Sequence, residues 1–299
     1  MIAHYEAENI DQVKTIWKQM KQAKDVYANR QSYNIVLRAL ASGSIRDAEQ
    51  AHSIWRKMVS VSKDDRKVTP STYHYGIVMA SWARTRDERA PKMCALILNT
   101  LKENLKTEEN LSVTIAHYNT LLSTYRWKLD DTAKTQVFNV VKEMLASGLD
   151  LDFLCYSNMI AALVRCQNDE SVKLAAELFD EAHEMLDLSI SDSYKLLGLM
   201  MRGWADSKVP GAADRCLELY NRLNERCRSD ESDGALQSEG RMIRSVVQSL
   251  LSSGKVEQVG QAEEILELVE KSASNDVDRR LDRGTYMLLI DYYATAKRV

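Results

Sequence analysis

One spacing of apolar residues recurs seven times along the 299-residue chain. A small or apolar residue is followed by large apolar residues three, four and seven positions later, so that all four side chains lie on one helix face. The seven segments begin at Val13, Ala51, Cys94, Lys134, Ala175, Cys216 and Ala262. Lys134 breaks the pattern, and Ala133 beside it can take its place. The sequence therefore predicts seven amphipathic helices of one kind, which we name B helices.

A second pattern alternates with the first. It starts with an aromatic or large apolar residue and continues with apolar residues at the same three spacings. These segments, which we name A helices, begin at Tyr33, Tyr75, Tyr118, Tyr156, Leu197, Ile243 and Tyr286. The separation from this leading residue to the apolar residue at position five of the next B segment stays between 20 and 23 residues, as from Tyr156 to Phe179. This near-constant separation predicts that each A helix and the following B helix form a hairpin.

Hairpins that each leave an apolar face uncovered bury those faces by stacking in order. The predicted fold is an all-α, right-handed α-solenoid of about seven antiparallel hairpins, forming a single helical-repeat domain over 1–299. Within it, 1–25 is an incomplete first repeat with a B helix only, 31–280 holds six hairpins, and 281–299 is a terminal A helix. Because solenoid ends need covering, we expect more chain or neighbouring subunits at both ends.

Turn residues agree with these boundaries. Three glycines follow periodic runs, where a left-handed residue ends a helix: Gly43, Gly148 and Gly254. Asp47 and Asp131 stand where an N-cap acceptor would precede a B helix. Pro91 and Pro210 are expected to open later B helices. The polar run 229–233 is expected to form a solvated loop.

Composition excludes several classes of function. The chain has 40 basic and 43 acidic residues, so its formal charge of −3 gives no whole-molecule attraction to phosphate. No apolar run reaches the roughly 18 residues that a membrane span needs. The start of the chain contains Glu6, Glu8 and Asp11, unlike an Arg-rich import presequence. We expect any targeting segment to be removed or to lie outside this chain.

No catalytic motif is present. The five cysteines and five histidines lack the spacing of a zinc site, and the cysteines are expected to be reduced, buried thiols. Neither a Gly-rich phosphate loop nor a nucleophile elbow occurs. The sequence thus predicts no enzyme activity, no metal, no cofactor and no small-molecule substrate.

Several A-helix openings carry a family resemblance. The segments 33–37 (Tyr-Asn-Ile-Val-Leu), 118–122 (Tyr-Asn-Thr-Leu-Leu) and 156–160 (Tyr-Ser-Asn-Met-Ile) resemble the opening Tyr-Asn-Thr-Leu-Ile of pentatricopeptide repeats. The segment 51–58 is similar to that family's helix B, and 147–156 is similar to its inter-repeat turn. Every repeat here is longer than the usual 35 residues of that family.

The resemblance implies one RNA base read by each repeat. In that family two residues do the reading: the one after the leading tyrosine, and the one four positions before the next tyrosine. The candidate RNA-binding pairs are Asn119 with Asp152, Asn34 with Ser71, Ser157 with Ser193, and Arg244 with Asp282. Asn119 with Asp152 matches a family combination associated with uracil. At the corresponding positions Gly76, Gly198 and Met287 carry no such polar side chain, which argues against a continuous readout.

These positions also have a structural interpretation, because Asn, Ser and Asp commonly cap helices. Two arginine groups could contact phosphate, although acidic residues lie among them: Arg84, Arg86 and Arg89, and Arg279, Arg280 and Arg283. The resemblance implies a non-enzymatic, organellar (mitochondrial) ribonucleoprotein component, ribosome-associated, with rRNA or mRNA and neighbouring protein subunits as partners. Two alternatives stay open: a sequence-specific factor for organellar transcript processing, stability or translation, and a protein-binding scaffold of the tetratricopeptide type.

Overall fold

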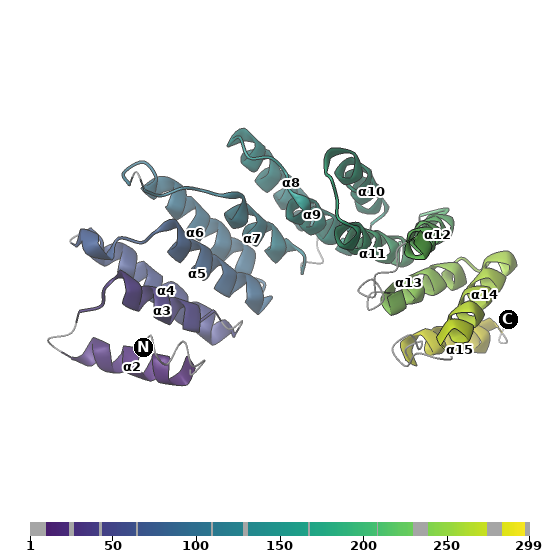
Figure 1. Ribbon diagram of the computed structural model, residues 1–299, viewed down its shortest axis with the longest axis horizontal. Helices are drawn as coiled ribbons and strands as arrows, with labels where there is room; N and C mark the ends of the chain where they lie inside the picture. The colour runs from purple at the N-terminus through teal and green to yellow at the C-terminus, as the bar shows by residue number, and fades with distance from the viewer. Residues whose placement is uncertain are drawn as a thin grey trace. The chain divides into compact units, whose positions relative to one another are not determined.

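The computed structural model describes residues 10–23, 27–41, 44–63, 65–108, 110–127, 131–166, 168–207, 209–229, 239–273 and 283–296. Every regular element in these ranges is helical, with 14 α-helices and one short 3-10 helix, η1 (Figure 1). The B helices are α2 (Ile10–Gln22), α4 (Ile45–Val61), α6 (Ala90–Asn104), α8 (Asp131–Ala146), α10 (Asp169–Met185), α12 (Ala212–Ser229) and α14 (Val256–Ala273). The A helices are α3 (Arg30–Ala39), α5 (Thr72–Thr85), α7 (Ile115–Tyr125), α9 (Phe153–Arg165), α11 (Ile190–Asp206), α13 (Glu239–Ser252) and α15 (Arg283–Ala296). The 3-10 helix η1 (Arg66–Val68) lies between α4 and α5.

The helices form two compact units. Unit 1 comprises 1–128 and 137–150, and unit 2 comprises 129–136 and 151–299, so that α8 contributes to both. In unit 1, α3 packs on α4 and α5 on α6, while each B helix from α2 to α6 also contacts the next A helix. In unit 2, the pairs α9–α10, α11–α12 and α13–α14 pack in the same way. The predicted all-α fold of stacked hairpins is confirmed, while its right-handed sense and single-domain organisation stay predictions.

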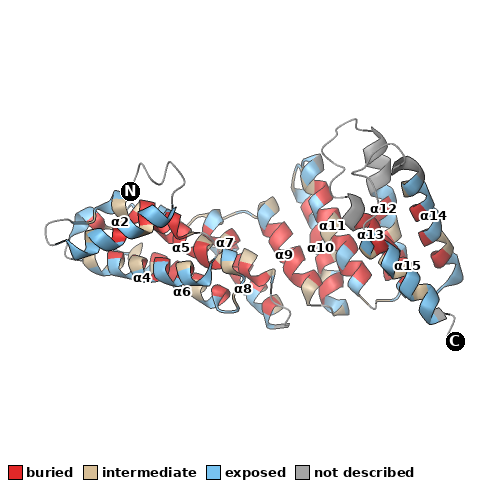
Figure 2. Cartoon of the chain, turned by 90° about the horizontal axis from the view of Figure 1, so that it is seen from below, coloured by how far each residue is buried: buried red, intermediate tan, exposed pale blue. Residues whose placement is uncertain are grey.

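Burial follows the helix-face patterns. Figure 2 shows buried residues on the sides of helices that face other helices, with exposed residues opposite. In the fourth B helix Ala133 is fully buried, and Lys134 Nζ lies 2.8 Å from Glu170 Oε1. Ala133 therefore takes the core position that the pattern gives to Lys134, as predicted. Burial of each large apolar side chain contributes about 1.5–3 kcal/mol. The repeated apolar faces are therefore the core of both units.

Four leading tyrosines occupy equivalent places. Tyr33, Tyr75, Tyr118 and Tyr156 are each the fourth residue of an A helix and are at most 4% exposed. Their rings pack edge-on against B-helix aromatics in two cases, Trp17 with Tyr33 and Trp55 with Tyr75. This confirms the register that the sequence predicts.

Tyrosine hydroxyls join the two helices of a hairpin. Tyr118 Oη donates to Glu143 Oε1 at 3.1 Å, and Tyr156 Oη donates to Glu181 Oε1 at 2.9 Å, in both cases 25 residues further along the chain. In the α5–α6 hairpin Tyr75 Oη instead accepts from Asn104 Nδ2 at 2.7 Å. Burial and the Glu181 carboxylate raise the pKa of Tyr156 to about 12. The Tyr156 hydroxyl therefore stays protonated and able to donate at neutral pH.

Buried thiols repeat in the same way. Cys94 Sγ lies 3.3 Å from the Met79 carbonyl oxygen, and Cys216 Sγ lies 3.6 Å from that of Met201. Each pair is 15 residues apart and joins the start of a B helix to its A helix. Burial raises the pKa of Cys94 and of Cys216 to about 12, so neither is a nucleophile at neutral pH.

Some predicted boundaries are wrong. The N-cap of α4 is Ser44, whereas Asp47 lies in the first turn and accepts from Lys14 Nζ at 2.8 Å. Pro91 lies in the first turn of α6 as predicted, but Pro210 precedes α12 by two residues. Gly148 and Gly254 adopt positive φ, +73° and +68°, as expected of residues that end helices. Ser229 ends α12 and is not part of a loop, and Asp131 is the first helical residue of α8 and not its N-cap. Gly43 and residues 230–233 lie outside the described residues.

Helix α11 begins about two turns before its predicted leading residue. Its N-cap is Ser189, whose hydroxyl accepts from the Asp192 amide at 3.1 Å, so Leu197 is the eighth helical residue rather than the fourth. The apolar pattern did not indicate this early start, because the capping residues Ser189 and Asp192 lie before its first residue. Ser193 therefore lies inside the helix and not at its cap.

Candidate nucleic-acid interface

The A helices of unit 1 carry no negative side chain. Helices α3, α5 and α7 contain neither Asp nor Glu, although the chain has 43 acidic residues. Helix α9 of unit 2 shares this property, whereas the B helices α10 and α14 are strongly acidic. Because like charges repel, the acid-free A helices suit an anionic ligand better than the B helices do.

Two asparagines follow leading tyrosines in unit 1. Asn34 is half-buried, and its Oδ1 atom has no hydrogen-bond partner in the described structure. Asn119 is 8% exposed. Between them in sequence, Gly76 leaves space, because an added Cβ would meet only His117 Nε2, at 3.7 Å. The Asn34 Oδ1 atom is itself buried, so its hydrogen-bonding capacity is unused in the described structure.

Histidines hold the N-caps of two A helices in unit 1. The Ser71 amide donates to His74 Nδ1 at 3.1 Å, and the Thr114 amide donates to His117 Nδ1 at 3.2 Å. The cap hydroxyls lie 2.8 Å from the same Nδ1 atoms. Since Nδ1 accepts from an amide, each ring is neutral, with its proton on Nε2. His117 Nε2 then donates to the Thr72 carbonyl at 3.3 Å, linking α7 to α5.

This arrangement predicts acid sensitivity. Burial lowers the pKa of both His74 and His117, although backbone hydrogen bonds partly oppose it. A lowered folded-state pKa stabilises the fold above the unfolded value of about 6.5, and that stability is lost as the pH falls toward the folded-state pKa. We expect His74→Gln/His117→Gln, whose amides can still cap, to flatten the fall of the urea midpoint between pH 7.5 and 5. An equally steep fall in the double variant would contradict this.

The predicted reading residues of unit 2 are partly structural. Asp152 caps α9 by accepting from the Cys155 amide at 2.8 Å, and Ser157 is 8% exposed. Ser193 is 3% exposed within α11, so it does not hold the inter-repeat position predicted for it. Arg244 is exposed on α13, and a Cβ on Gly284 would lie 2.6 Å from its Nη1, so α15 passes close to this side chain.

The predicted pairs are distributed over both units. Asn119 belongs to unit 1 and Asp152 to unit 2, and each is described within its own unit. Asp282, Arg279 and Arg280 lie outside the described residues. Ser71 is a cap in unit 1, as its predicted position requires, while Met287 is 41% exposed on α15. Binding of RNA by all of these residues stays a prediction.

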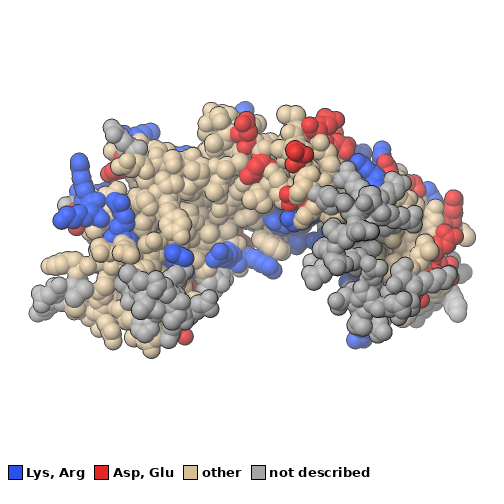
Figure 3. All heavy atoms as spheres, in the orientation of Figure 1, with Lys and Arg blue, Asp and Glu red and all other residues tan. Residues whose placement is uncertain are grey.

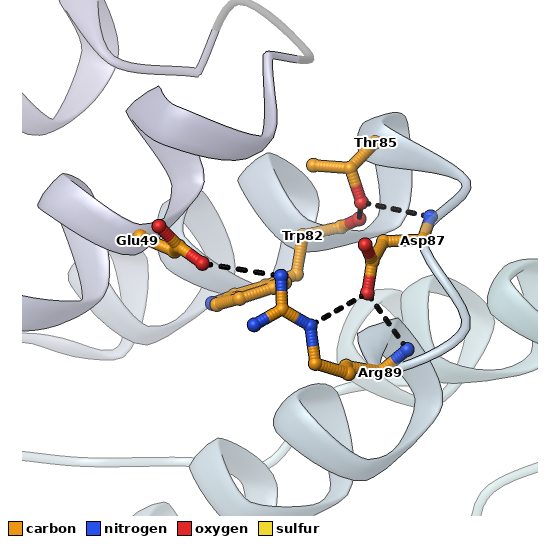
Figure 4. Close-up of polar contacts among 5 residues, drawn as sticks. All are labelled: Glu49, Trp82, Thr85, Asp87 and Arg89. Atoms are coloured by element: carbon orange, nitrogen blue, oxygen red, sulfur yellow. Dashed lines mark hydrogen bonds and ion pairs between the residues drawn. The ribbon is translucent and has the colours of Figure 1, made fainter.

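The first arginine group connects neighbouring elements of unit 1. Arg89 pairs with Asp87 at 2.9 Å and with Glu49 of α4 at 3.1 Å, beside the Trp82 ring (Figure 4). The Arg84 guanidinium donates to the Ala41 carbonyl. These contacts favour the structural interpretation over phosphate binding for Arg84 and Arg89.

Arg86 is held in the left-handed region, with φ 56°. Its guanidinium lies 4.0 Å from the centroid of the Trp127 ring, a cation–π contact within unit 1. Asp87, the next residue, has a pKa lowered by hydrogen bonds from Arg89, so its carboxylate stays charged at neutral pH. This turn therefore joins neighbouring elements of unit 1 and also presents basic side chains.

Sequence reasoning missed the capping role of His74 and His117. The signal was present, because Ser71 and Thr114 each precede a histidine by three residues, the spacing of a capping box. The usual capping box has Glu or Gln at the third helical position, so His74 and His117 were not recognised as capping residues. Among the described residues no cluster of His, Cys, Asp or Glu could hold a metal, and no helix could cross a membrane.

The fold and these surfaces define a helical-repeat protein built from stacked A–B hairpins. No protein-family model matches the chain, and no curated protein matches it. Solved structures that are similar to it include the crystal structure of the pentatricopeptide repeat protein PPR10 from maize, with 15% identity and a TM-score of 0.42. That match covers 96% of this chain and 44% of PPR10.

A second similar structure is PPR10 in complex with an 18-nt psaJ RNA element, with 14% identity and a TM-score of 0.38. It covers 98% of this chain and 50% of that one. The chain thus spans about half the length of the solved structures that it matches. Both bear the name of the family that the sequence resembles.

Proposed function

We propose that this chain is a non-enzymatic RNA-binding repeat protein of the pentatricopeptide type, which binds single-stranded RNA along its A helices. The observation that carries the proposal is the absence of acidic residues from α3, α5 and α7, beside the unpartnered Asn34 Oδ1. A surface without carboxylates lets phosphates approach, and Asn34 and Asn119 carry side-chain amides of the kind that pairs with base edges. One of the similar solved structures, PPR10, is in complex with an RNA element.

The finer setting is part of the same proposal. We place the chain in an organellar, mitochondrial ribonucleoprotein, associated with the ribosome and with neighbouring protein subunits. Its support is the family resemblance together with the gaps in the reading series at Gly76, Gly198 and Met287. Such gaps favour binding by shape over reading of a long sequence.

Binding of homopolymeric single-stranded RNAs tests the function. We expect wild-type protein to bind at least one of them, with an affinity that falls as salt rises. Asn34→Ala/Asn119→Ala removes two amides and should weaken binding about tenfold or more, since each hydrogen bond contributes roughly 0.5–1.5 kcal/mol. Asn139→Ala, at an exposed position of α8, is the matched control and should bind as wild type. Equal affinities for all three proteins would contradict binding through these residues.

A further inference from the structure

A basic segment follows the first hairpin of unit 1. Five of the twelve residues from 56 to 67 are Lys or Arg: Arg56, Lys57, Lys63, Arg66 and Lys67. The first two lie in the C-terminal half of α4, and the others lie between α4 and the end of the 3-10 helix η1. All five side chains are exposed. We name these five residues the basic edge.

Hydrogen bonds hold the backbone of residues 65–69, which carries part of the basic edge. Asp65 caps η1 by accepting from the Lys67 amide at 2.9 Å, and the Thr69 hydroxyl donates to the Arg66 carbonyl at 2.8 Å. Val68, at 3% exposure, anchors the end of η1 in the core. Arg66 and Lys67 are therefore presented by a held backbone, which reduces the entropy lost when they bind.

The basic edge keeps a net positive charge, because residues 56 to 67 contain five Lys or Arg and two acidic residues, Asp64 and Asp65. No ion pair joins any of the five side chains to a described carboxylate. Figure 3 shows Lys and Arg side chains gathered at the left of the view, where α4 ends in Figure 1. The loop that follows α8, in contrast, has no basic residue and contains Asp150 and Asp152. The basic edge is thus a feature of one repeat and not of every turn.

The surroundings decide what kind of partner the basic edge fits. Protein interfaces centre on aromatic and apolar side chains, and charged residues are depleted there. Within the described structure, no large exposed hydrophobic residue lies between Ile45 and Tyr73. Phosphate contacts, in contrast, need only exposed Lys and Arg side chains. An RNA backbone therefore fits this surface better than an acidic protein does.

We propose that the basic edge is a second RNA-contact surface, which binds the phosphate backbone without regard to base sequence. It lies on B helix α4 and the following loop, apart from the A-helix residues Asn34 and Asn119. It goes beyond the proposed function, because it requires no base reading. Its affinity comes from released counterions and thus depends steeply on salt.

The test compares two triple variants of the full chain with equal net charge. Lys63→Gln/Arg66→Gln/Lys67→Gln removes part of the basic edge, and Lys92→Gln/Lys142→Gln/Lys173→Gln removes three exposed lysines of B helices α6, α8 and α10. The probes are a mixed-sequence single-stranded RNA, an RNA duplex and poly-glutamate, titrated at several salt concentrations. Circular dichroism and the thermal midpoint confirm that both variants fold.

We expect the edge variant to bind both RNAs at least tenfold more weakly than wild type at low salt. Its plot of log affinity against log salt should be less steep by about 2, since each lost contact to a single strand contributes about 0.7. Equal losses in the two variants, wild-type affinity in the edge variant, or binding of poly-glutamate in place of RNA would overturn the proposal. Failure of the proposed function looks different: Asn34→Ala/Asn119→Ala then binds as wild type while the edge variant still loses affinity.

Discussion

Replacing Trp82 by Ala is expected to lower the free energy of unfolding by about 3–5 kcal/mol, the usual range for a buried Trp. Trp82 is 2% exposed on α5, its ring lies 6.1 Å from His52 of α4, and the Arg89 guanidinium lies 5.6 Å from its centroid. The truncation would leave a cavity between two hairpins and remove the aromatic support of Arg89. Urea denaturation of the full chain, followed by far-UV circular dichroism, measures the loss.

A second tryptophan supplies the control. Trp127 is 40% exposed and contacts Arg86, so Trp127→Ala should cost about 1 kcal/mol or less, the range of an exposed cation–π pair. Trp82→Phe should fall between the two alanine variants, because Trp82 Nε1 has no partner to lose in the described structure. If the two alanine variants lost the same free energy, Trp82 would not be a core residue of unit 1.

Gly203→Ala is expected to destabilise unit 2 by about 1–3 kcal/mol through overpacking. A Cβ built on Gly203 of α11 would lie 2.5 Å from Val164 Cγ1 and 2.9 Å from Val164 Cβ on α9. Val164 is β-branched and 4% exposed, so its side chain has little freedom to move away. The two A helices would have to separate, and the urea midpoint should fall.

The control for this prediction is another helical glycine. Gly260 of α14 has nothing within 4 Å of an added Cβ, so Gly260→Ala should be neutral or stabilising by up to about 1 kcal/mol. In a double-mutant cycle, Val164→Ala should reduce the cost of Gly203→Ala, because it removes the nearer of the two contacts. Additive effects of the two substitutions would argue against close contact between these residues.

The repeat spacing was sufficient to predict the hairpins, because a helix face is a local property of the sequence. Tyr33, Tyr75, Tyr118 and Tyr156 therefore occupy the predicted places, and Ala133 replaces Lys134 in the core. Helix α11 begins well before Leu197, the leading residue of its apolar pattern, because its N-cap is Ser189. Helix ends depend on single polar residues, which periodicity does not report.

The candidate site was less predictable. Its reading positions came from the resemblance, whereas the partners of each side chain depend on the neighbouring repeat. The capping histidine of α7 illustrates this. His117 Nε2 contacts the carbonyl oxygen of Thr72, which lies 45 residues earlier in the chain. The arginines of 84–89 likewise find their partners on α4 and near the ends of α3 and α7. A local sequence pattern does not report contacts between residues that lie this far apart in the chain.

The tyrosine hydroxyl bonds suggest how the repeats tolerate changes in length. Tyr118 reaches Glu143 and Tyr156 reaches Glu181 across the same 25 residues, so each bond measures the span of its own hairpin. An insertion in the turn between the A and B helices would move the glutamate away from its tyrosine. An insertion after the B helix would leave the bond intact. These two hairpins should therefore tolerate a change of length better in the connections that follow them than in the turns inside them.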